Sequence, residues 1–370
     1  PEKSSVGGSN DIGPHFVSGG RDGRVHIWSY KMVKTWSLDL TDPATSPSSS
    51  NPQIRAVATI DDRLILGTKA SEIYEVDLLT SDKNLYRLCQ GHYDERSETW
   101  GLCVHPTRQK FYTVGDDMTA RLWDAKSMRQ ESMVYLGKKA RSVTVRPDGG
   151  HVAVGCYDGH VKILSADLAS EIADSSPTSA WIEAIVYSPD SERLAVGAHD
   201  NKIYLLDTKT YSVREICKGH SSFISNIDFS ADCKYLQSTS GAYELLFWDV
   251  TTGKQEKSST AVRDVKWATF TSTLGWPVQG IWPTGSDMSD VNSTDRNEDM
   301  SLIVTGDDFS RVKLFSYPAA KERSNFKEFK GHSEHVPNVR FSKDGKYVFS
   351  VGGLDKAVMQ YEVVSMRTIR

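Results

Sequence analysis

The chain has 370 residues, 38% of them hydrophobic, so it can bury a full core, but it exceeds the length at which one compact core usually stops growing. Its 44 basic and 48 acidic residues give a formal net charge of −4 and a pI near 6.2, which offers no bulk electrostatic reason to expect a nucleic acid or a membrane as partner. The dispersed cysteines show no metal-ligand spacing and indicate reduced core thiols, and no apolar run approaches the roughly 18 residues of a membrane span. We therefore expect a cytoplasmic protein with two domains or a modular core.

One strand–turn–strand unit recurs along the chain. Each copy is an apolar run, a turn rich in glycine and aspartate, and a second alternating run, which is the pattern of a β-hairpin. The copies are residues 16–28, 64–76, 111–123, 152–164, 194–206, 236–248, 302–315 and 348–361. Aligned on one turn residue, they lie 41 to 48 residues apart, except for one spacing of 66 between Ala242 and Asp308. A fixed period of this kind predicts a repeat architecture.

Further alternating strands lie between the hairpins, at residues 99–106, 140–147, 181–189, 223–230 and 335–342. A unit of four strands can cover its apolar faces only with its neighbours, so the units predict a ring. Gly-His pairs before a strand, such as Gly91-His92, and Trp-Asp pairs after one, such as Trp123-Asp124, are typical of the WD40 repeat. We expect an all-β WD40 β-propeller of seven to eight four-stranded blades, with an atypical or incomplete N-terminal blade at 16–28.

The domain organisation follows from this period. We expect a poorly ordered segment at 1–14, a single propeller over 15–364 and a C-terminal tail at 365–370. An insert at 272–300 accounts for the long spacing, and its part 284–300 is acidic and has the composition of a mobile segment at its distal end.

One register position supplies a candidate structural network. The histidine of each Gly-His pair is expected to hydrogen-bond with the turn aspartate and a serine or threonine of its blade, and each tryptophan that closes a hairpin is expected in the core. His199 is read as a turn residue. The network residues are His92, Asp117, Trp123, Asp158, Asp200, His220, Trp248, His332 and Asp355. Ala70 and Ala242 stand where the aspartate is expected, so their two hairpins need another anchor.

Motifs for catalysis do not occur in the sequence. It has no phosphate-binding or dinucleotide-binding glycine loop, no HExxH, no GxSxG and no calcium loop. We therefore predict no enzyme activity, no catalytic residue, no cofactor and no metal. Two basic stretches, Lys138-Lys139 with Arg141 and Arg146, and residues 321–330, are either solvated rim or a patch for an acidic partner.

The insert region carries a family resemblance. The stretches VRDVKWATFTSTLGWPVQGIWPTGSDMSDVN (262–292) and LIVTGDDFSRVKLFSYP (302–318) resemble the C-terminal propeller of the echinoderm microtubule-associated protein-like family, as do GHSSFISNIDFS (219–230) and SVGGLDKAVMQYEV (350–363). The resemblance runs from about residue 16 to 363. It implies the second of two tandem propellers, with a companion propeller upstream, and association with tubulin, microtubules or another cytoskeletal protein in the cytoplasm, at the cytoskeleton or in the cilium. Ala242 and the loop at 95–98 depart from the family pattern, so the partner can differ as well.

The functional hypotheses follow from this resemblance. The first is a non-catalytic interaction module of a microtubule-associated protein. The alternative is a general WD40 scaffold or adaptor, ciliary or ubiquitin-ligase-linked, that recognises a peptide at the propeller face. A hydrolase or lyase lacks a catalytic constellation. Candidate partner-binding residues are Trp276, Trp282, Asp287, Asp290, Lys138 and Lys139. The two tryptophans of the insert either cap their own blade or form an aromatic and acidic lip that contacts tubulin or the companion propeller.

Overall fold

The computed structural model describes residues 16–42, 52–79, 84–89, 91–93, 97–282, 286 and 290–364, and these are almost entirely β-structure. Eight antiparallel sheets form over this part of the chain, with one short α-helix and one short 3-10 helix. The chain divides into two compact units, residues 1–93 and 94–370. Each unit is described by itself.

Residues 1–93 hold two sheets. The first has three strands, β1 (Phe16–Gly19), β2 (Arg24–Trp28) and β3 (Lys34–Asp39), and the second has four, β4 (Ile54–Ile60), β5 (Arg63–Thr68), β6 (Ile73–Asp77) and β7 (Leu85–Cys89). Alternate side chains of both sheets, among them Val25, Leu38, Ile54 and Leu66, form one buried cluster. The period-two alternation of the strands therefore supplies the apolar face that joins the two sheets.

Residues 94–370 hold six sheets. Their strands are β8 (Thr99–Val104), β9 (Lys110–Gly115), β10 (Thr119–Asp124) and β11 (Arg129–Tyr135); β12 (Ala140–Val145), β13 (His151–Cys156), β14 (Val161–Ser165) and β15 (Glu171–Ser175); β16 (Ile182–Tyr187), β17 (Arg193–Ala198), β18 (Lys202–Asp207) and β19 (Val213–Lys218); β20 (Ile224–Phe229), β21 (Tyr235–Ser240), β22 (Leu245–Asp249) and β23 (Gln255–Glu256); β24 (Val291–Arg296), β25 (Leu302–Asp307), β26 (Arg311–Ser316) and β27 (Phe326–Lys330); and β28 (Asn338–Phe341), β29 (Tyr347–Val351) and β30 (Val358–Glu362).

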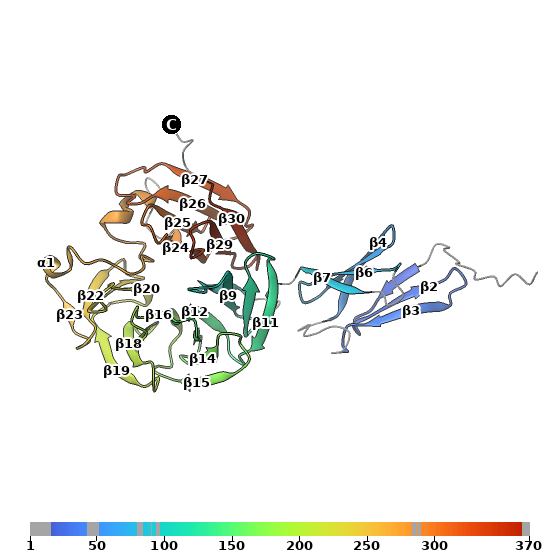
Figure 1. Cartoon of the computed structure of the whole chain (residues 1–370), viewed down its shortest axis with the longest axis horizontal. Helices are drawn as coiled ribbons and strands as arrows, with labels where there is room; N and C mark the ends of the chain where they lie inside the picture. The colour runs from blue at the N-terminus through green and yellow to red at the C-terminus, as the bar shows by residue number, and fades with distance from the viewer. Residues whose placement is uncertain are drawn as a thin grey trace, which may run out of the picture. The chain divides into compact units, whose positions relative to one another are not determined.

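These six sheets stand as blades around a centre. In Figure 1, strands β12, β16, β20 and β24 lie toward the middle of the ring, while β11, β15, β19, β23 and β27 run along its outer edge. Each inner strand packs beside the inner strand of a neighbouring sheet in the series β28, β8, β12, β16, β20. The last sheet meets the first, where the rings of Phe111 and Phe349 stack 4.6 Å apart. The ring of residues 94–370 therefore closes between β28 and β8.

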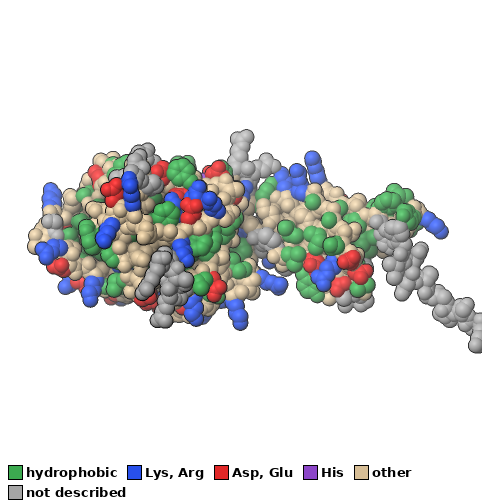
Figure 2. Space-filling model, turned by 90° about the horizontal axis from the view of Figure 1, so that it is seen from above, with side chains coloured by type: hydrophobic (Ala, Val, Ile, Leu, Met, Phe, Trp, Pro, Cys, Tyr) green, Lys and Arg blue, Asp and Glu red, His purple; other side chains and the backbone are tan. Residues whose placement is uncertain are grey.

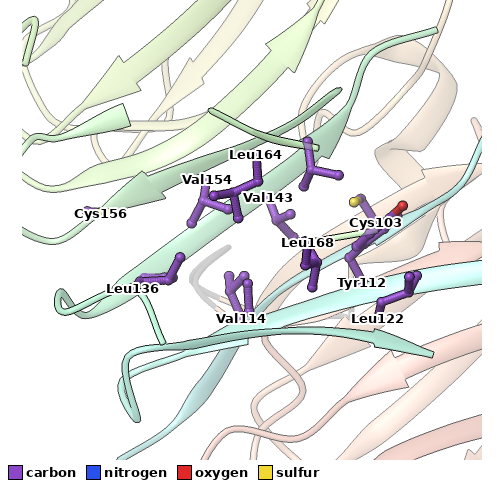
Figure 3. Close-up of a cluster of buried hydrophobic side chains, with 13 residues drawn as sticks. Cys103, Tyr112, Val114, Leu122, Leu136, Val143, Val154, Cys156, Leu164 and Leu168 are labelled. Atoms are coloured by element: carbon purple, nitrogen blue, oxygen red, sulfur yellow. The ribbon is translucent and has the colours of Figure 1, made fainter. Parts of the chain in front are cut away.

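Apolar clusters between adjacent blades hold the ring together. Figure 3 shows one of them, in which Tyr112, Val114 and Leu122 from one sheet meet Val143 and Val154 from the next. Because each blade covers the face of its neighbour, single-blade stability depends on the ring as a whole.

The inserted segment fills the place between β20 and β24. Trp267 forms an isolated antiparallel bridge with Ser230, and the buried Asp228 of β20 accepts hydrogen bonds from the Thr269 Oγ1 at 2.6 Å and the Thr271 backbone N at 2.9 Å. On the other side, Arg296 of β24 donates to the carbonyl of Trp267 at 2.8 Å. The segment after α1 (Ser259–Val262), which continues into the 3-10 helix η1 (Trp276–Ile281), thus bridges two blades.

The predicted all-β propeller fold is confirmed. All eight predicted hairpins are antiparallel pairs, and the predicted N-terminal hairpin belongs to the three-stranded β1–β3 sheet of residues 1–93. Within the predicted acidic segment 284–300, residues 291–296 form β24, because backbone pairing with β25 supports a strand whose side chains are mostly polar. The predicted segments 1–14 and 365–370 lie outside the described residues, and a single propeller over 15–364 stays a prediction.

Candidate functional site

A hydrogen-bonded histidine anchors the hairpin of the last blade. His332 Nδ1 lies 2.9 Å from the Asp355 Oδ2, and its Nε2 lies 2.7 Å from the Ser350 Oγ. The same carboxylate accepts the backbone N–H of Ser333 at 3.0 Å. These contacts join the β29–β30 hairpin turn to the segment that leads into β28 of the same blade. Their role is structural.

A glutamate takes the aspartate's part in the β20–β23 blade. His220 Nδ1 lies 3.0 Å from the Glu244 Oε2, two residues beyond Ala242, and its Nε2 lies 2.7 Å from the Ser238 Oγ. The backbone N–H of Ser221 donates to the carboxylate at 3.0 Å, and this bond leads the interactions that lower the pKa of Glu244 to about 2. The anchor that Ala242 cannot supply therefore comes from Glu244.

The same offset recurs in the β4–β7 sheet. Ala70 stands at the aspartate position, and Glu72, two residues on, is buried and accepts a hydrogen bond from the Thr68 Oγ1 at 3.1 Å. In both hairpins that have alanine at the aspartate position, a glutamate two residues later therefore supplies the carboxylate.

The two tryptophans of the predicted network close their hairpins in the core. Trp123 Nε1 donates to the Thr113 Oγ1, and Trp248 Nε1 donates to the Ser238 Oγ, each at 2.8 Å. Because an indole nitrogen only donates, the Ser238 hydroxyl hydrogen is free to donate to His220. A directed chain of hydrogen bonds therefore runs from Trp248 to Glu244.

Asp117 lies in a buried polar group at the β9–β10 turn. It accepts hydrogen bonds from the Thr119 backbone N at 3.1 Å and the Thr119 Oγ1 at 2.8 Å, and it forms an ion pair with Arg121 at 3.2 Å. His92, the histidine predicted to join this network, is buried and belongs to residues 1–93. Their predicted pairing stays a prediction.

Asp158 and Asp200 use other partners in place of a histidine. Lys138 forms an ion pair with Asp158. Lys138 directly follows Gly137, so it stands where the histidine of a Gly-His pair stands in other blades. Asp200 accepts hydrogen bonds from the Tyr204 hydroxyl at 2.5 Å and from Lys202 Nζ at 3.0 Å. Lys138, predicted as a partner-binding residue, is thus placed in the hairpin anchor of its own blade.

The two tryptophans of the insert have different surroundings. Trp282 packs against the buried cluster around Phe270, and its Nε1 donates to the Thr273 carbonyl oxygen at 3.1 Å. Trp276 is 65% exposed. The cap interpretation therefore describes Trp282, while Trp276 is available on the surface.

Two further predicted partner-binding residues, Asp290 and Lys139, make local contacts. Asp290 accepts a hydrogen bond from the Ser286 Oγ at 2.7 Å, and Asp287 lies outside the described residues. The Lys139 carbonyl oxygen accepts the backbone N–H of Tyr157. On the face seen in Figure 2, lysine and arginine side chains are dispersed over the larger unit.

A β-bulge repeats at the start of the inner strands. In five blades the ladder register shifts between the first and third residues of the inner strand, which leaves the second residue unpaired. These second residues are Trp100, Arg141, Glu183, Ser225 and Asn292, and all five line a central cavity of about 990 Å³. Because a bulge re-aims a side chain, the repeated bulge turns one side chain per blade toward one end of the cavity. We call this end, lined by the five bulged residues, the channel mouth.

Aromatic rings follow one side of this mouth. The Arg141 guanidinium carbon lies 3.9 Å from the Trp100 ring centre and 5.3 Å from that of Trp181. Trp181 is 4.6 Å from His199, which stacks on Phe223 at 4.5 Å and 11°. We call this set, with Tyr157 at 4.2 Å from Trp181, the aromatic arc: Trp100, Arg141, Tyr157, Trp181, His199 and Phe223.

Backbone hydrogen bonds hold the arc in place. The residue before each of three inner strands, Lys139, Trp181 or Phe223, accepts at its carbonyl oxygen the N–H of a hairpin-turn residue in the same blade at 2.8 to 2.9 Å. In the last case this residue is Gly241, where a Cβ atom would lie 2.3 Å from the Phe223 ring. Only a glycine fits beneath that ring.

Carboxylates surround the arc. Glu183 lies 3.3 Å from His199 Nε2, and Glu98 and Glu334 lie 3.5 Å and 3.2 Å from the ring nitrogens of His335. The fourth carboxylate lining this end of the cavity, Asp308, accepts a hydrogen bond from Asn292. The channel mouth is therefore aromatic and acidic.

Three polar atoms of the mouth have no hydrogen-bond partner among the described residues. They are Trp100 Nε1, Arg141 Nε and Asp116 Oδ1, and the last two lie 3.5 Å apart. Arg141 and Asp116 form an ion pair with each other, so the Trp100 indole N–H is the one of the three that no described residue satisfies.

Sequence reasoning missed this site apart from Arg141. The sequence predicts a turn at His199, and Trp100, Trp181 and Phe223 lie in predicted strands with no motif that distinguishes them. The repeat register could have identified Trp100, Trp181 and Phe223, since these three residues stand at or just before the start of inner strands.

The described residues contain no group of three or more His, Cys, Asp or Glu side chains that could hold a metal ion. Nor does any helix in the described ranges have the length and apolarity to cross a membrane.

A model of the second β-propeller of the echinoderm microtubule-associated proteins matches residues 99–363, and a WD40 repeat model matches residues 5–29. The chain is 38% identical to the 77 kDa echinoderm microtubule-associated protein of Lytechinus variegatus, over 95% of this chain and 52% of that protein. It is 37% identical to echinoderm microtubule-associated protein-like 2 of Rattus norvegicus, over 93% of this chain and 52% of that protein. The chain thus spans about half the length of these curated relatives.

Among solved structures, hydrazine synthase of Kuenenia stuttgartiensis is similar in fold. It aligns with a TM-score of 0.58 at 12% identity over 72% of this chain and 95% of that one. This likeness concerns the fold alone.

Proposed function

This chain belongs to the echinoderm microtubule-associated protein family, and on that basis we propose that it is a non-catalytic module that binds tubulin, microtubules or another cytoskeletal protein. Its relatives are named for association with microtubules. The proposal places this chain at the cytoskeleton in the cytoplasm, with a companion propeller upstream in the longer protein.

The observation that carries the proposal is the channel mouth. Exposed aromatic side chains stand around it, with Phe223 36% exposed and Tyr243 50% exposed. Monomeric proteins seldom display aromatic rings in a group unless a partner covers them, and aromatic residues are enriched where interface energy concentrates. The mouth is concave and its walls are fixed by backbone bonds, which suits recognition of a protein segment without rearrangement.

The alternative of a general scaffold that reads a peptide uses the same surface. The cavity favours it specifically, since about 990 Å³ lies at the upper end of the size range of ligand pockets. The two hypotheses differ in the partner and not in the place where it binds.

Co-sedimentation with microtubules and gel filtration with soluble tubulin test the proposal. We expect the 370-residue chain to pellet with microtubules or to co-elute with tubulin. If the chain binds neither microtubules nor tubulin, the scaffold hypothesis is favoured. The Trp276→Ala variant is a control for the exposed part of the insert, because the Trp276 side chain does not line the cavity.

A further inference from the structure

Within the aromatic arc, the aromatic rings already contact one guanidinium, that of Arg141. Its planar group lies over the Trp100 ring at 3.9 Å and beside the carboxylate of Asp116 at 3.5 Å. An aromatic face together with a carboxylate is the environment that a guanidinium prefers, since the ring attracts the cation and the carboxylate accepts its hydrogen bonds. The chain's own arginine thus shows what this mouth accepts.

The other end of the arc has the same composition. Phe223 and Tyr243 line the cavity there, and the bulged Glu183 points into it from β16. Glu183 is 3.3 Å from His199, which stacks on Phe223, so the imidazole links a carboxylate to an aromatic ring at this end as well. The backbone of Gly241 also lines the cavity there, and the Phe223 ring lies where a Cβ atom at this position would stand.

Within the described residues, Glu183 is paired with His199 and with no lysine or arginine. The lysines and arginines that line the cavity within the described residues are Arg141, Arg340 and Lys343. Arg141 is beside Asp116, whereas Arg340 and Lys343 lie toward the end of β28, and Lys343 is paired with Glu298 at 2.8 Å. The start of the strands therefore presents an excess of carboxylate over cationic side chains.

We propose that the channel mouth binds an arginine-bearing segment of a protein partner, with the guanidinium beside the exposed Phe223 and Tyr243 rings and the carboxylate of Glu183. The inference rests on the proposed use of the mouth as a protein-binding surface, and it does not require that the partner be tubulin. An arginine fits better than a lysine, because its planar fork can stack on the ring and donate to the carboxylate at the same time. An acidic segment would meet like charges at the same place.

A direct test uses a fluorescein-labelled peptide of alternating arginine and glycine and measures its fluorescence anisotropy with the 370-residue chain at low salt. Matched peptides carry citrulline, the uncharged isostere, or glutamate in place of arginine. We expect binding of the arginine peptide, loss of binding with citrulline, and weaker binding as salt rises.

Variants locate the binding. Glu183→Gln removes the charge and should weaken the arginine peptide about tenfold, because a hydrogen bond to a charged group is lost. Phe223→Ala should weaken it about threefold through loss of the ring face. Glu192→Gln makes the same charge change in the exposed turn between β16 and β17, at the far end of the blade, and should leave binding unchanged. Thermal midpoints equal to that of the parent chain establish that each variant is folded.

Equal binding of the arginine and citrulline peptides, tighter binding of the glutamate peptide, or equal losses in Glu183→Gln and Glu192→Gln would overturn the inference. Tubulin gel filtration on the same samples separates the two proposals. Binding of the arginine peptide without tubulin binding would reject tubulin as the partner and support the inference. Tubulin binding without binding of the arginine peptide would support tubulin as the partner and overturn the inference.

Discussion

Replacing Glu244 with glutamine removes a charge while keeping the shape of the side chain that anchors the β21–β22 hairpin. The carboxylate lies at hydrogen-bond distance from His220, Ser221 and the Ser240 hydroxyl, and its pKa falls from 4.5 to about 2. Because one pKa unit is worth about 1.4 kcal/mol, this fall corresponds to roughly 3 kcal/mol of folding free energy. About 29% of the side chain is exposed, so solvent screening reduces the expected loss to about 2 kcal/mol.

The pH dependence gives the sign of this effect. A carboxylate whose pKa is lowered by folding contributes its full stabilisation above its unfolded value of 4.5, and loses it as the pH falls toward 2. Urea denaturation should therefore show Glu244→Gln less stable than the parent chain by about 2 kcal/mol at pH 7, with the difference shrinking at pH 3. Glu215→Gln, on β19, serves as a charge-matched control with little expected effect. A difference that stays constant between pH 7 and pH 3 would refute the electrostatic origin, and no difference at pH 7 would refute the anchor itself.

Three further variants address the insert and the mouth. Asp228→Asn should lower the free energy of unfolding by about 3 kcal/mol, because the buried carboxylate holds the inserted segment, and limited proteolysis should then cut that segment sooner; an unchanged proteolysis rate would contradict its role. Gly241→Ala should displace the Phe223 ring and weaken the arginine peptide several-fold in the anisotropy assay, whereas unaltered binding would show that the ring position does not matter. Trp282→Ala should lower stability in thermal melts by about 2 kcal/mol through lost packing and a lost hydrogen bond, while Trp276→Ala should change it by less than about 0.5 kcal/mol; equal losses would refute their different placement.

Much of the fold could be predicted from the sequence because period-two alternation and glycine-rich turns recur at nearly constant spacing. The strand β24 escaped prediction because Val291 is its one strongly apolar residue, and pairing with β25 supports it instead. The anchors Glu72 and Glu244 escaped because they lie two residues beyond the alanines that were aligned with aspartate, and a longer side chain makes up that offset.

The aromatic arc could not be predicted from any one stretch of sequence. Its members come from successive blades about forty residues apart, and each by itself reads as an ordinary residue near a strand start or in a hairpin turn. Packing of neighbouring blades brings Trp100, Arg141 and Trp181 together, and the bulge decides which side chain of each strand turns inward. Both are properties of the assembled ring.

The most direct measurement of the central claim is microtubule co-sedimentation of the parent chain, of the double variant Glu183→Gln with Phe223→Ala, and of Glu192→Gln. If the channel mouth is the protein-binding surface, the parent chain and Glu192→Gln will pellet with microtubules, and the folded double variant will remain largely in the supernatant. If the double variant pellets as fully as the parent chain, the partner binds elsewhere on the ring.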